Sequence, residues 1–296
     1  MFNVRYQFRK PKGRVVPKGP SFSFARTIKT EIDGTTLRFK APRHSPERPS
    51  HKPVFPERHL ITEKLHFRMY KDERISVPYD WGKFLLFDHA WIFNGPWFTG
   101  MQGNVQFYMN LVKPLNYSNS DFSLFHPRAF EQRLGDYLTY QFAGPFSDIQ
   151  HKCYCIGPVE WQPYTRLPVV AARFKIERDT SIMTSTPEHF LAFPIADQLM
   201  VTLMFIPSQF WVGTQEEKDK RISAEPMLKL VEQIIASLEV ELSPAAKAQQ
   251  QAALAGLEDT SLVKEYPPLN WNNPELRPNK KSNKNQAYTD DDYLLK

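Results

Sequence analysis

Hydrophobic and polar positions alternate along short stretches of this chain, which is the period-two pattern of half-buried β-strands. The stretch 65–70 alternates in this way. An Asp33-Gly34 pair between two β-prone segments predicts a hairpin, because glycine accepts the positive φ of a tight turn. Short apolar runs bounded by turn residues predict further strands at 84–87, 90–93, 105–112, 153–156, 169–176, 190–193 and 199–206.

Two other segments repeat their apolar residues every three or four positions, the period of an amphipathic helix, and a third is rich in Ala and Gln. The first helix is predicted at 125–140. The clearest is predicted at 226–238, with one apolar stripe and with Ser223 as its N-terminal cap. A third is predicted at 244–254, between a cap at Ser243 and a stop at Gly256.

Strands outnumber helices and do not alternate with them, which argues against a parallel βαβ arrangement. We therefore expect the α+β class: an antiparallel β-sheet with a few helices packed on one face, and a C-terminal amphipathic helix. The same patterns divide the chain into three parts. We expect a flexible, basic, proline-rich arm at 1–20, a single α+β domain at 21–257, and a polar, largely irregular tail at 258–296.

Composition excludes several classes of protein. With 41% hydrophobic residues among 296, the chain is too apolar for wholesale disorder. No apolar run reaches the roughly 20 residues of a membrane-spanning helix, and 2 cysteines are too few for a disulfide-stapled scaffold. Basic residues follow Met1 and Phe2 without the apolar core of a secretory signal. We therefore expect a cytoplasmic protein with no membrane partner.

The formal net charge of +6 is distributed unevenly. Residues 1–60 hold 14 Lys and Arg against 4 Asp and Glu, which leaves 24 against 28 for the rest of the chain. The basic excess therefore belongs to the N-terminal region, whereas the predicted domain is mildly acidic. Because basic and aromatic residues do not alternate there as in single-strand binders, we expect no nucleic-acid partner.

Complete catalytic motifs do not occur in the sequence: there is no glycine-rich phosphate loop, no G-x-S-x-G and no H-E-x-x-H. The best metal candidates are His151, Cys153 and Cys155, which share one face if the segment is a strand. A fourth ligand has no evident source, so buried, reduced cysteines are the favoured interpretation. We expect no metal, no cofactor and no enzyme. An enzyme with a scattered metal or acid–base site stays an alternative.

Aromatic residues stand beside turn residues and carboxylates at several points. Such residues anchor protein interfaces, because they bury large areas at modest entropic cost. Trp91 and Phe93 alternate on one strand and are expected in the core. For Trp97, Trp161 and Trp211 a core position and an interface position both remain open. The predicted partner-binding residues are Asp88, Trp97, Glu160, Trp161, Tyr164, Arg166, Trp211, Glu216, Glu217 and Asp219.

The segments 189–197, 200–205 and 230–238, the last of which ends in Ile234-Ile235-Ala236-Ser237-Leu238, together resemble a known unit. They are similar to the C-terminal half of immunity proteins that neutralise toxins delivered by bacterial type VI secretion. The resemblance implies an antiparallel sheet ending in one amphipathic helix. It also implies a protein without catalytic residues that occludes a cognate toxin, a nuclease effector, stoichiometrically. The basic N-terminal region departs from the acidic inhibitors usual against nucleases. An adaptor or chaperone for a secreted effector is the alternative.

Overall fold

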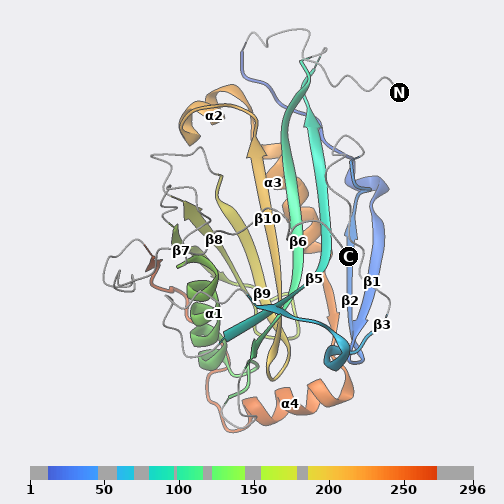
Figure 1. The fold of residues 1–296 in the computed structure, drawn as a ribbon, viewed down its shortest axis with the longest axis vertical. Coiled ribbons are helices and arrows are strands. Elements are labelled where there is room, and N and C mark those ends of the chain that lie inside the picture. Colours follow the sequence, from blue (N-terminus) through green and yellow to red (C-terminus); the bar gives the residue numbers. More distant parts are fainter. Residues whose placement is uncertain are drawn as a thin grey trace, which may run out of the picture.

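A computed structural model describes residues 13–45, 59–69, 80–96, 99–115, 122–143, 155–178 and 186–271. These residues form two β-sheets with helices packed against them, so the predicted α+β class is confirmed. In Figure 1 the long strands of the larger sheet run along the long axis of the molecule, and the smaller sheet lies beside them.

The larger sheet is antiparallel throughout. The predicted strands at 84–87 and 90–93 are parts of one long strand, which continues across a β-bulge at Leu86. The strands across the sheet are, in order, β12 (Leu269–Asn270), β7 (Cys155–Pro163), β8 (Ala172–Arg178), β9 (Glu188–Ala196), β10 (Leu199–Gln209), β6 (Met101–Leu115), β5 (Asp80–Asn94) and β4 (Arg68–Met69).

The smaller sheet is built around the predicted hairpin. Asp33 and Gly34 form its turn with φ of 46° and 80°, and Ile32 pairs with Thr35 across it. Two positive φ values suit a two-residue hairpin turn, whose twist matches that of the strands. The strands, in order, are β11 (Glu239–Glu241), β2 (Thr35–Ala41), β1 (Arg26–Ile32) and β3 (His59–Leu60). Two short 3-10 helices, η1 (Phe22–Phe24) and η2 (Thr62–Lys64), flank it.

The replacement Gly34→Ala is expected to lower the free energy of unfolding by about 1 kcal/mol, because a side chain disfavours positive φ. The added Cβ would also lie 3.2 Å from the Cβ of Ser243. Denaturant unfolding measures the effect. The matched control is Gly256→Ala, where φ is also positive but no atom lies within 4 Å of the added Cβ. The Ser243 contact is unimportant if the two variants lose the same stability.

Helices cover both faces of the larger sheet, whereas the sequence predicted them on one. Along β9, Leu191 packs in a core with α3 and the smaller sheet, and the neighbouring Phe190 packs in a second core with α1. Figure 1 likewise places α1 and α3 on opposite sides of the sheet. Both faces need cover because the central strands are apolar on both sides. The helices are α1 (Pro127–Phe142), α2 (Gln215–Arg221), α3 (Glu225–Ala236) and α4 (Pro244–Leu254).

The predicted helix ends are partly correct. Ser243 caps α4 by accepting a hydrogen bond from the Ala246 backbone N–H, as expected. Ser223 does not cap α3, because the helix begins one residue later than predicted and Ala224 holds the N-cap position without a side-chain cap bond. Among the described residues, no helix combines the length and the apolar character that a membrane span requires.

Parts of the expected arm and tail belong to the folded body. Val15 is buried and bridges to Ile222, and Lys18 exchanges two backbone hydrogen bonds with Asn94. At the other end, Trp271 is buried and donates from its indole to the hydroxyl of Thr139 at 3.1 Å. Residues 13–20 and 258–271 are therefore packed on the domain, and the rest of the arm and tail lies outside the described residues.

Candidate protein-binding surface

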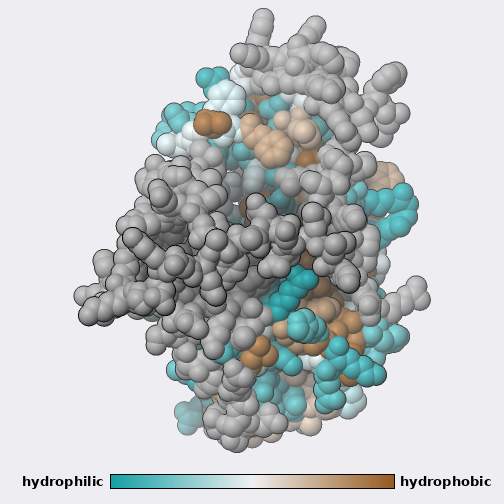
Figure 2. Space-filling model, viewed as in Figure 1, coloured by the Kyte–Doolittle hydropathy of each residue, from teal (hydrophilic) through white to brown (hydrophobic). Residues whose placement is uncertain are grey.

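An exposed apolar loop joins β10 to α2. Phe210 and Trp211 are each 41% exposed, and Val212 is 88% exposed. Val16 is 60% exposed. It lies at the same end of the molecule, because the N–H of the neighbouring Val15 donates to the carbonyl of Arg221 at the end of α2. We call Val16, Phe210, Trp211 and Val212 the apolar end. Figure 2 shows brown and tan atoms gathered over this end. Grouped apolar exposure of this kind is typical of interaction sites.

The backbone of this loop is held by several contacts. The Phe210 N–H donates to the carbonyl of Gln102 at 2.7 Å, which ties the loop to β6. Gly213 has a φ of 144°, and a Cβ there would lie 2.4 Å from Oε2 of Glu217. Glu217 also accepts from the Thr214 N–H at 2.7 Å and completes a capping box. The apolar side chains are thus presented from a well-defined backbone.

The ring of Trp211 rests against a cation. The guanidinium carbon of Arg221 lies 5.3 Å from the ring centroid, a distance suited to a cation–π contact. This contact restrains the ring and leaves much of it exposed. Trp211 is therefore a preorganised anchor, the kind of residue that loses little entropy when a partner covers it.

The carboxylates of α2, which the sequence predicted as partner contacts, are each engaged within the chain. Glu216 is paired with Lys220 at 2.6 Å. Asp219 accepts from the side-chain amides of Gln209 at 2.7 Å and Gln215 at 3.1 Å, and Glu217 caps the helix. The three acids are matched within α2 by Lys218, Lys220 and Arg221. The charge beside the apolar end is therefore balanced.

A second group of predicted residues lies on β7 and the loop to β8. Trp161 is only 8% exposed, because its indole donates to the carbonyl of Val263 at 2.8 Å and its ring packs on Tyr266 at 4.9 Å. It is a core residue, which corrects its assignment to an interface. Tyr164 is half-buried and donates to the carbonyl of Ile235 at 3.3 Å.

Glu160 and Arg166 are exposed. Glu160 is ion-paired with Lys175 at 2.5 Å and has an unusual φ of 51°. Tyr164 also lines a cavity of about 290 Å³ between this loop and α4, where Gln250 donates to the carbonyl of Pro168. This second group therefore offers polar contacts around a shallow cavity and no exposed tryptophan.

The remaining candidates are separate from both groups. Asp88 lies on β5 and is buried, so its carboxylate is not an exposed contact in the isolated chain. Trp97, His151 and Cys153 lie outside the described residues, and Cys155 is buried in the core beside α1. Within the described ranges, no cluster of three or more His, Cys, Asp or Glu side chains could hold a metal ion.

The structure also groups polar residues that sequence reasoning did not select. On the face of the larger sheet that carries α3, Arg173 is bonded to both oxygens of Glu232, and Lys175, two residues further along β8, is ion-paired with Glu160. His189 is close to these pairs. Burial, together with the positive charges of Lys175 and Arg173, lowers the pKa of His189 to about 4, although Glu160 and Glu232 oppose the shift.

The nine predicted contacts that the structure describes thus do not form one surface. Trp211 precedes α2, which lies at the upper end in Figure 1, whereas β7 lies along its left side. The exposed neighbours Phe210, Val212 and Val16 were not selected, although an apolar run of three residues directly after a strand and before a glycine is a usable signal. Comparisons with family models, curated proteins and solved structures give no match.

Proposed function

We propose that this protein acts by binding another protein through its apolar end, and that the partner is a toxin delivered by type VI secretion, which it neutralises by occlusion. The observation that carries the proposal is the exposed Trp211 with Val212 beside it, on a loop restrained by hydrogen bonds. The identity of the partner rests on the resemblance of the segments 189–197, 200–205 and 230–238 to immunity proteins.

The chemistry of the apolar end suits a protein partner. Interfaces are anchored by a few buried aromatic side chains and surrounded by polar groups that exclude water. Trp211 with Arg221 supplies the anchor, and the balanced charges of α2 supply the rim. Because the rim carries no net charge, the partner need not be strongly basic.

The test is co-expression with the toxin. A protein captured by this chain should stop growth when expressed alone, and wild-type chain should restore growth. Trp211→Ala and Val212→Asp should each weaken binding by about 30-fold or more, the effect of losing a hot-spot residue. Titration calorimetry with the purified toxin measures the dissociation constant.

The matched control is Phe24→Ala, which removes an aromatic ring that is 83% exposed outside the apolar end. It should bind and protect as the wild type does. Full protection by both Trp211→Ala and Val212→Asp would contradict the proposed surface. A captured protein that is harmless by itself would contradict the immunity role and favour the adaptor or chaperone alternative.

A further inference from the structure

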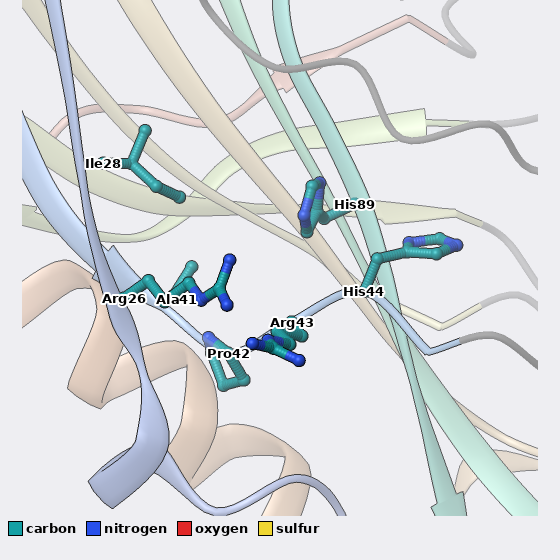
Figure 3. Close-up of a pocket in the computed structure, with 7 residues that line it drawn as sticks. All are labelled: Arg26, Ile28, Ala41, Pro42, Arg43, His44 and His89. Atoms are coloured by element: carbon teal, nitrogen blue, oxygen red, sulfur yellow. The ribbon is translucent and has the colours of Figure 1, made fainter.

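A pocket of about 420 Å³ opens at the seam between the two sheets. One wall comes from Arg26 and Ile28 on β1, and another from the residues that follow β2, including Pro42 and Arg43. His89 of β5 faces the pocket from the larger sheet (Figure 3). Its volume lies within the range of about 300–1,000 Å³ that is common for small-molecule sites.

The walls of this pocket are fixed by hydrogen bonds across the seam. The indole of Trp91 donates to the carbonyl of Pro42 at 3.2 Å. Three residues further along the chain, Ser45 donates from its N–H to the carbonyl of Ala90 at 3.0 Å and accepts from the Ile92 N–H at 2.9 Å. The segment after β2 is thus attached to β5, so the pocket is formed before any ligand arrives.

The permanent charge at this pocket is positive. Arg26 and Arg43 are both exposed at its mouth, and no Asp or Glu is found among the described residues that line it. In Figure 3 both side chains reach into the space below His89. Two guanidinium groups on one concavity suit an anion with several oxygens, because each guanidinium can donate two parallel hydrogen bonds.

The two imidazoles of the pocket are held in opposite tautomers. Nδ1 of His44 accepts from the Ala90 N–H at 3.1 Å, so this nitrogen carries no proton. Nδ1 of His89 lies 2.7 Å from the carbonyl oxygen of Asp88, which only accepts, so this nitrogen carries the proton. The ring of His89 is further stacked on Phe87 at 4.2 Å.

The floor of the pocket is apolar. Ala41 and Pro42 are buried, Ile28 is half-buried, and the rigid ring of His89 closes the far side. Water finds few hydrogen-bond partners on such a lining, whereas a flat apolar group of a ligand removes its own apolar surface from water by packing against it. The pocket therefore combines a cationic mouth with an apolar interior.

We propose that this seam pocket binds a small organic phosphate, with the phosphate held by Arg26 and Arg43 and an aromatic or apolar body against Ile28, Pro42 and His89. The site is separate from the apolar end and independent of the proposed toxin. A phosphate is favoured over a single carboxylate because its three terminal oxygens and double charge engage two guanidinium groups at once.

The probes are phenyl phosphate, inorganic phosphate and benzoate, titrated into the full chain at low salt by calorimetry. Phenyl phosphate should bind most tightly, since it alone joins a phosphate to an aromatic body. Arg26→Gln and Arg43→Gln should each weaken its binding by about tenfold or more, the loss expected for one charge-assisted contact. Arg38→Gln, which removes an exposed charge on the same sheet outside the pocket, should leave binding unchanged.

Three results would overturn the assignment: no binding of phenyl phosphate, tighter binding of benzoate than of phenyl phosphate, or equal binding by the two pocket variants and the wild type. Both arginines are exposed, so these variants should remain folded, which circular dichroism checks. A Trp211→Ala variant should bind phenyl phosphate normally, which separates failure of this site from failure of the proposed function.

Discussion

Replacement of Phe107 by alanine should lower the free energy of unfolding by about 3–5 kcal/mol, the range for a large aromatic side chain removed from a closed core. Phe107 is completely buried on β6 and its ring is stacked on Phe205 at 4.3 Å. It also meets Phe39 of the smaller sheet edge-on at 5.8 Å. The substitution therefore leaves a cavity where the two sheets join, and denaturant unfolding followed by circular dichroism measures the loss.

Phe24→Ala is the matched control, because it removes the same ring from an exposed position. It should change stability by no more than about 0.5 kcal/mol. A loss below about 1 kcal/mol in the Phe107 variant would show that the cavity collapses or that the two sheets do not share a core.

Acidification from pH 6.5 to 4 should destabilise the protein, in part through His189. Its pKa in the folded chain is about 4, below the ordinary value of 6.5. Between pH 6.5 and 4 the unfolded chain binds a proton at His189 that the folded chain does not bind. The contribution of His189 to stability is therefore fully present above pH 6.5 and is lost as the pH falls toward 4. At 1.36 kcal/mol per pKa unit, the contribution lost is up to about 3 kcal/mol.

His189→Gln should remove this contribution, because glutamine does not titrate. The unfolding free energies of both proteins are measured between pH 4 and 8. The difference between them should change only between pH 6.5 and 4, where the wild type loses the His189 contribution and the variant has none to lose. Lys175→Gln should reduce the acid loss in the wild-type background, because removing a nearby positive charge raises the pKa of His189. If the wild type and the His189→Gln variant lose stability in parallel, His189 is not the group responsible.

Local patterns located most of the secondary structure. The helix predicted at 244–254 is α4, and the Asp33-Gly34 turn is found as expected. The prediction that all helices pack on one face of the sheet was wrong. An amphipathic stripe indicates that one side of a helix is buried, but it does not indicate which face of the sheet covers that side. The continuous apolar run of β9 was the available signal, since a strand without alternation is covered on both faces.

The candidate site was harder to predict than the fold. Trp161 and Trp211 have the same local signal, a tryptophan beside turn residues, and opposite positions. Trp161 is covered by Val263 and Tyr266, about a hundred residues further along the chain, whereas Trp211 remains exposed next to Arg221. Exposure depends on which distant segments fold over a residue, and its spacing from local turns does not contain that information.

By itself, the sequence determined the class of the fold, the main strands and helices, and the hairpin turn. These follow from periodicity and from backbone preferences that act within a few residues. Only the tertiary structure decided that both faces of the larger sheet are covered, that Trp211 is exposed, and that Arg26, Arg43 and His89 line one pocket. The physical reason is that burial and convergence come from contacts between distant segments, which no local spacing encodes.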